Sequence, residues 1–335
     1  MSFNPERAFE YAHSFSERDL TDDEWEVNLS FAQPYRKKEP HIDDFKKIHQ
    51  SDIDRQRDKQ KVIGLKTRAS EMEKTERAIL LEAILAEHIE QSEWLGSNAY
   101  TFQTTEFDDR INHTDLVVEF EVPEGERYLA IDVTTTGDDR VLSDKKKRIS
   151  QEIGRGSMTM IKYFESQVDM DNPQKVLNHI PRVVVNIRPE IIERLATTQR
   201  KILDKKPGAN QAMAHDAVQI EILTQIESQL TDDVIQVLRN FSDIKHVPSD
   251  RKKDVERLLE IISHLSGSTE RVVKQAEEKG FLDILEQIAQ TEDDEQDAGN
   301  QPKISQYVML KKLTQVRSII QSTLSEKKEN KPQRL

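Results

Sequence analysis

The sequence has no cysteine among its 335 residues. This absence excludes disulfides, thiolate zinc sites, iron–sulfur clusters and a thiol nucleophile. Long apolar runs are also missing: none approaches the ~18 residues of a membrane span, and the chain is charged from Glu6 onward. We therefore expect a soluble, cytoplasmic protein with no membrane partner.

Apolar residues are scarce and charged residues are plentiful. Hydrophobic residues make up 35% of the chain and charged residues 33%, against a usual ~45–50% and ~25%. A core can be built from only part of this length, which suits about two domains. The net charge of −13 repels phosphate, so a nucleic-acid partner would require a local basic surface.

Three regions differ in their patterns. Residues 1–66 are polar, and we expect a partly disordered extension or loose helices there. Residues 67–206 mix helical and strand patterns, whereas 207–335 is helical, with an acidic loop near 291–302 and a solvated tail. In the first region, alternating apolar residues predict a short strand or a docking segment: Trp25, Val27, Leu29 and Phe31.

The middle region predicts an α/β core in which a sheet is layered with helices. Its expected elements are a helix over 68–89, strands over 100–105, 115–122 and 128–135, helices over 138–153 and 158–167, and a strand over 182–187. The expected C-terminal helices span 191–203, 212–230, 232–241, 251–265, 269–290 and 304–324.

Glu82 stands out on the first helix of this core. At 100° per residue it lies about 20° from Ile89 and about 40° from Ala78, at the margin of the apolar stripe. A carboxylate there is costly unless a partner, a metal or a cleft receives it. The alternative is that Glu82 snorkels at the core boundary.

Two aspartates belong to strands that we expect to pair. Asp115 opens one strand, and Asp132 lies inside the apolar run of the next, where β-propensity disfavours an aspartate. Pairing would bring both carboxylates to one edge, an arrangement that suits a hard divalent cation such as Mg²⁺ or Mn²⁺. His113, close by in sequence, is either a loop residue or a ligand or proton carrier.

Basic residues follow the acidic pair. Residues 140–206 carry 15 Lys+Arg against 8 Asp+Glu, a local charge of +7 within a negative chain. On the helical wheel Lys146 lies about 20° from Ile153, so it is the lysine best aimed at the core, unless the run is simply solvated. Five further residues are candidates for contact with nucleic-acid phosphates: Lys145, Lys147, Arg148, Arg155 and Lys162.

This order of acids and elements resembles the PD-(D/E)XK, or restriction-endonuclease-like, nuclease core over roughly residues 70–190. The resemblance implies a mixed sheet flanked by helices, with Glu82, Asp115 and Asp132 as metal-binding catalytic acids. The motif places a lysine where this chain has Thr134. Some members of the superfamily supply that lysine from the following helix, and here Lys146 or Lys145 would do so.

Two functions follow from these patterns. The first is a metal-dependent nuclease that hydrolyses phosphodiester bonds in nucleic acid. The second is a catalytically inactive scaffold, whose C-terminal helices bind a protein partner or a second copy of the chain.

Overall fold

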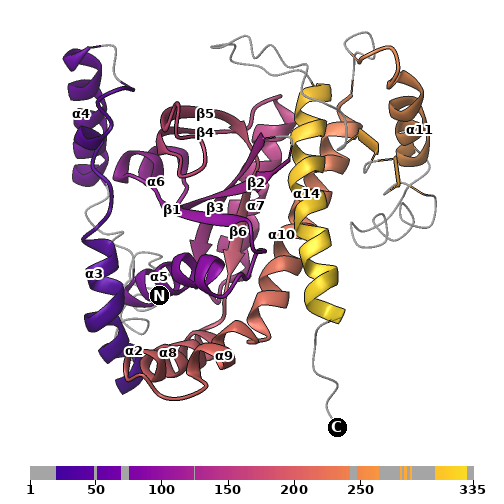
Figure 1. The fold of residues 1–335 in the computed structure, drawn as a ribbon. Helices are drawn as coiled ribbons and strands as arrows, with labels where there is room; N and C mark the ends of the chain where they lie inside the picture. The colour runs from indigo at the N-terminus through magenta and orange to yellow at the C-terminus, as the bar shows by residue number, and fades with distance from the viewer. Residues whose placement is uncertain are drawn as a thin grey trace, which may run out of the picture.

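A computed structural model describes most of the chain: residues 20–48, 51–68, 75–123, 125–241, 247–263, 280, 283–284, 287–288 and 306–329. Figure 1 shows a central sheet with helices around it.

The central sheet has four strands in the order β1-β2-β3-β6. The strands are β1 (Ala99–Gln103), β2 (Leu116–Val122), β3 (Gly125–Thr134) and β6 (Arg182–Asn186). β2 pairs antiparallel with both β1 and β3, whereas β6 pairs parallel with β3. The predicted α/β class and its mixed sheet are therefore confirmed.

The two faces of this sheet pack against different layers because successive side chains along a strand point to opposite faces. Leu116 and Ile131 lie in the main core together with residues of the C-terminal helices. Val117 and Ala130 contribute to a smaller cluster that also contains Phe164. Asp132, two residues after Ala130, falls by this alternation on the face of the smaller cluster.

The second layer comes from a two-stranded sheet, which corrects the prediction of a helix over 158–167. β4 (Thr159–Glu165) pairs antiparallel with β5 (Gln174–Ile180). Ile161 and Tyr163 are both buried at a two-residue spacing, the period of a strand. The sequence patterns predicted neither β5 nor the short helix α6 (Glu106–Asn112).

Two helices flank the site described below. α5 (Glu76–Gln91) is capped by Thr75, whose hydroxyl accepts a hydrogen bond from the Ala78 amide, and it is buried on nearly every side. α7 (Asp139–Gly154) leads from the end of β3 toward the β4–β5 pair and β6. Both agree with predicted helices to within a few residues in their described parts.

The N-terminal region is helical, so the predicted strand is wrong. α2 (Asp22–Val27) continues into a π-helix (Asn28–Ala32) and α3 (Gln33–Arg36). The Arg77 guanidinium donates two hydrogen bonds, of 2.7 and 2.9 Å, to the buried Glu24 carboxylate, which docks α2 on α5. Next come a 3-10 turn, Ile42–Asp44, and the long helix α4, Asp52–Arg68. Residues 1–19 lie outside the described part.

The C-terminal helices are α8 (Pro189–Leu203), α9 (Ala209–Ala214), α10 (Val218–Arg239), α11 (Lys252–Ser263) and α14 (Gln306–Glu329). α10 is one helix where the sequence predicted a break near residue 231. Most of the helix predicted over 269–290, and the acidic loop near 291–302, lie outside the described residues.

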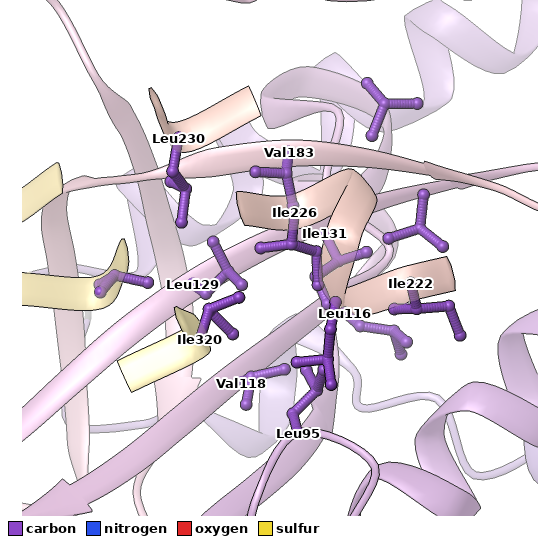
Figure 2. Close-up of a cluster of buried hydrophobic side chains, with 14 of the residues drawn as sticks. Leu95, Leu116, Val118, Leu129, Ile131, Val183, Ile222, Ile226, Leu230 and Ile320 are labelled. Atoms are coloured by element: carbon purple, nitrogen blue, oxygen red, sulfur yellow. The ribbon is translucent and has the colours of Figure 1, made fainter. Parts of the chain in front are cut away.

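The main core runs through both the sheet and these helices. In Figure 2, Ile222 and Ile226 of α10 approach Ile131 and Val183 of the sheet. α10 lies beside α14 (Figure 1), whose Ile320 joins the same core. The helices after residue 206 therefore complete the hydrophobic core of the sheet.

Candidate functional site

Asp115 and Asp132 lie at the same end of the β2–β3 pair. The pairing of these strands ends at Leu116 and Ile131, the residues that follow Asp115 and precede Asp132. The Asp115 amide donates to the Ile131 carbonyl at 2.9 Å. Besides burial, the negative charge of Asp115 raises the pKa of Asp132, so the two carboxylates lie near one another.

Asp115 is fixed by backbone. Its side chain is buried, and its Oδ2 accepts a hydrogen bond of 2.6 Å from the Val133 amide. This bond crosses between the strands just where regular pairing ends. The carboxylate is thereby held in one orientation against β3.

Asp132 is held by a lysine of the next helix. Lys145 Nζ donates to Asp132 Oδ1 at 2.7 Å, and the Asp132 side chain is only 14% exposed. Burial and the negative charge of Asp115 raise the pKa of Asp132, while the Lys145 ammonium opposes this rise. A cation is thus the natural partner of the Asp115–Asp132 pair.

Lys146 lies elsewhere, which corrects the wheel-based choice between the two lysines. It lines a groove between α7 and α10, near Asp232. The ion pair with the candidate acid belongs to Lys145, one residue earlier. The helix after β3 does supply a lysine to Asp132. That lysine is Lys145 and not Lys146.

Further charges surround the pair. The pKa of His113 is lowered to about 4, first by desolvation and then by the positive charges of Arg148, Arg182 and Lys145. His113 is therefore neutral near pH 7. Arg182 went unnoticed in the sequence because it opens an otherwise apolar strand. It is buried and donates to the Glu152 carboxylate at 2.8 Å and to the Asn112 carbonyl at 2.6 Å.

Glu82 is buried on α5, as the wheel suggested. However, no group of three or more histidine, aspartate or glutamate side chains in the described part of the chain is arranged to hold a metal ion. The metal-binding role of Glu82, Asp115 and Asp132 therefore stays a prediction. Of the three, Asp115 and Asp132 lie near one another, because the charge of Asp115 acts on Asp132.

The remaining predicted phosphate contacts fall into different surroundings. Lys147 lines the α7–α10 groove, and Arg155 is the exposed C-cap residue of α7. Lys162 lies on β4, where it is bound to Asp58 of α4 and sits 5.5 Å from the centre of the Phe107 ring. The positive charge of Lys162 is therefore already neutralised within the protein.

Comparison of the chain with protein-family models, curated proteins and solved structures finds no match in any of the three. Among the described residues, no helix combines the length and apolarity needed to cross a membrane.

Proposed function

We propose that the protein is a metal-dependent phosphodiesterase acting on nucleic acid. The observation that carries this proposal is the Asp115–Asp132 pair on neighbouring strands with Lys145 bound to it. The elements follow in the order α5, β1, α6, β2, β3, α7, β4, β5, β6, and the two acids just before β2 and within β3 support the PD-(D/E)XK resemblance.

The donor chemistry of the pair fits a hard divalent cation. Mg²⁺ commonly takes only one or two protein carboxylates and fills its remaining positions with water and substrate phosphate. Two aspartates therefore suffice, and Glu82 need not be a ligand. When bound, such a cation would offset the charge that develops on the phosphate and favour ionisation of a water molecule.

The residues of the chain would have separate tasks. Asp115, oriented by the Val133 amide, and Asp132 would bind the cation. Lys145 would then release Asp132 and bind a phosphate oxygen of the substrate. There it would stabilise the negative charge that develops on the phosphate. In the reaction, water adds to phosphorus, the P–O ester bond breaks, and the departing alkoxide oxygen takes up a proton.

Cleavage assays test this proposal directly. Labelled single- and double-stranded DNA and RNA are incubated with the full chain and Mg²⁺, Mn²⁺ or a chelator. We expect Lys145→Ala to lower the rate about 100-fold, the usual effect of removing one stabilising donor, and Asp132→Asn to abolish Mn²⁺ binding in calorimetry. The matched control Arg140→Ala changes an exposed residue of the same helix and is expected to act within twofold of wild type.

The alternative function has a distinct outcome. If the wild-type chain binds no Mn²⁺ and cleaves none of these substrates with either metal, the phosphodiesterase proposal is wrong and the scaffold interpretation replaces it. If Lys146→Ala rather than Lys145→Ala abolishes cleavage, the ion pair with Asp132 is not part of the reaction.

A further inference from the structure

A groove of about 360 Å³ lies between α7 and α10, on a different face of α7 from the Lys145–Asp132 contact. Four residues of α7 line it at the i, i+3, i+4, i+7 spacing that shares one helical face: Ser143, Lys146, Lys147 and Ser150. Each of these side chains ends in a hydroxyl or an ammonium, which can donate a hydrogen bond. The α7 wall is therefore a stripe of donors about 10 Å long, at 1.5 Å per residue.

α10 supplies the opposite wall. Its lining residues Asp232, Gln236 and Arg239 recur at steps of four and three, so they also share one helical face. The positive charges of Lys146 and Arg239 both lower the pKa of Asp232. A cation from each helix thus lies near the same carboxylate, and the groove brings the two cations together.

The three cations of the groove are Lys146, Lys147 and Arg239. All three are exposed, and none makes a hydrogen bond or an ion pair with a described residue. In contrast, Lys145 on the other face of α7 is paired with Asp132. Like charges that gather without a close anion repel one another, so the fold gains nothing from this arrangement. An anion from outside the protein would remove the repulsion.

The acids of the groove lie deeper than its cations. Asp233 is only 6% exposed, and Asp233 Oδ2 and Asp232 Oδ1 are buried. Burial raises the pKa of both carboxyls, that of Asp232 to about 6, because it disfavours their charged form. An anion that approaches from solvent therefore meets the exposed cations before it meets Asp233.

We propose that this groove binds the sugar–phosphate backbone of a single nucleic-acid strand, with phosphates on Lys146, Lys147 and Arg239. Phosphate oxygens accept hydrogen bonds from lysine, arginine and serine side chains, the donors that line the groove. The choice of nucleic acid among polyanions rests on the proposed function, because α7 carries Lys145 beside Asp132 on one face and the groove on another. A strand that leaves the Asp115–Asp132 pair can then cross α7 into the groove.

The shape of the groove favours one strand and no particular sequence. A duplex, whose major groove alone is about 12 Å wide, cannot enter a space of about 360 Å³. Aromatic side chains, on which bases stack, are absent from the residues that line the groove. Recognition would therefore depend on the backbone phosphates alone.

Fluorescence anisotropy of the full chain with a labelled single-stranded DNA of about 12 nucleotides tests the inference. A chelator in the titrations keeps binding separate from cleavage. Lys146→Ala and Arg239→Ala should each weaken binding about eightfold at about 50 mM salt, and each should reduce the slope of log affinity against log salt by about 0.7, as the loss of one phosphate contact implies. The control Lys46→Ala removes an equal charge from an exposed turn before α4 and should bind like wild type.

Three results of these titrations would overturn the inference. They are wild-type affinity in either groove variant, an equal loss in Lys46→Ala, and no binding of the DNA by the wild-type chain at about 50 mM salt. Competition tests the kind of polyanion. If polyglutamate of equal charge displaces the labelled strand as well as unlabelled DNA does, the groove takes acidic peptides and the inference is wrong. If a duplex of the same sequence loses as much affinity in Arg239→Ala, the groove does not select a single strand.

Asp232→Asn should have the opposite effect. This variant should bind the strand more tightly than wild type, because the carboxylate no longer competes with phosphate for Lys146 and Arg239. Asp171→Asn, which removes an equal charge from the exposed segment between β4 and β5, should bind like wild type. Weaker binding by Asp232→Asn, or an equal gain in Asp171→Asn, contradicts the inference.

Cleavage assays separate this inference from the proposed function. If the wild-type chain cleaves nucleic acid, Arg239→Ala should raise KM and leave kcat unchanged, because it removes binding and not chemistry. Cleavage with a wild-type KM in Arg239→Ala would refute the groove and leave the phosphodiesterase proposal standing. Binding that depends on Arg239 in a chain that cleaves nothing would support the groove and refute only the phosphodiesterase.

Discussion

Two buried aspartates, Asp108 on α6 and Asp233 on α10, are accommodated by the protein in opposite ways. Asp108 is fully buried and accepts hydrogen bonds from four donors. Two of these donors are the backbone amides of Lys162 and Tyr163, at 2.8 and 3.0 Å. Asp233 is buried nearly as deeply, yet one of its oxygens has no donor.

The difference indicates what each carboxylate is for. Asp108 ties α6 to β4, and it satisfies two buried donors, the Thr105 hydroxyl and the Tyr163 amide, that would otherwise be unpaired. Burial still raises the pKa of Asp108 to about 6, because its hydrogen bonds offset the desolvation only in part. Asp233 Oδ2 accepts no hydrogen bond from a described residue, so the fold gains little from the charge of this carboxylate. A buried acid that the fold does not need is a candidate for ligand binding.

Removing Asp108 should have the largest effect. Asp108→Ala leaves two backbone amides and two side-chain donors without an acceptor, so we expect a loss of about 3–5 kcal/mol in the free energy of unfolding. Urea denaturation at pH 7 measures it. The control is Asp139, an exposed acid in the first turn of α7. Asp139→Ala should cost less than about 1 kcal/mol, the usual worth of an acid near a helix N-terminus. Equal losses would show that Asp108 is no more structural than this exposed aspartate.

Asp233→Asn should have the opposite sign. The folded-state pKa of Asp233 is raised, so the unfolded chain ionises first and its ionisation destabilises the fold as pH rises above about 4. Removing that charge should stabilise the protein by roughly 1–3 kcal/mol at pH 7.5 and by little at pH 4. Denaturation at both pH values measures this. Destabilisation at pH 7.5 would mean that Asp233 already has a structural partner.

Asp232→Asn should act in the same direction but more weakly. Its folded-state pKa of about 6 lies above the ordinary value near 3.9, so the penalty builds up between about pH 4 and pH 6 and stays constant above. Asp232 is only partly buried, and solvent screening reduces the gain to on the order of 1 kcal/mol. The change in unfolding free energy between pH 4.5 and 7 should therefore be smaller in this variant. An unchanged difference would contradict the pKa shift.

The sequence predicted the central sheet because its strands carry strong local signals. Four of the six residues in 182–187 are β-branched, and the turn after Val122 joins two strands that pair in register. β4 gave no comparable signal, since the consecutive apolar residues Met160-Ile161 and Tyr163-Phe164 break the alternation that is typical of a strand. Its strand form depends on pairing with β5, which lies nine residues further along the chain.

The candidate site was predictable to the level of strands but not of individual lysines. An aspartate inside an apolar strand is unusual, so the sequence alone singles out Asp132. Its position near Asp115 then follows from the pairing of β2 with β3. The choice between Lys145 and Lys146 depends on how α7 is rotated about its axis, and one residue changes the direction by 100°. That rotation is set by contacts with β6 and α10, which no local pattern contains. The unpaired oxygen of Asp233 is likewise a property of its surroundings.

The smallest predicted effect concerns the end of the helix that carries Asp108. His113 follows α6 with φ of 53°, a left-handed conformation that favours glycine. His113→Gly should relieve this strain and, after the entropy cost of glycine, stabilise the protein by roughly 0.5–1 kcal/mol. Because the folded-state pKa is about 4, the unfolded histidine takes up a proton first as pH falls below about 6.5, which destabilises the wild type.

The gain from His113→Gly should therefore be larger at pH 5 than at pH 8, and urea denaturation at the two pH values measures the difference. Lys205, at φ 55° after α8, offers a matched control, since it has the same backbone conformation and is exposed. Lys205→Gly should give a similar gain at both pH values, because it leaves His113 and its pH-dependent ionisation unchanged. If His113→Gly shows no pH dependence, burial and the cations around His113 do not hold it neutral, and the environment assigned to the Asp115–Asp132 pair is wrong.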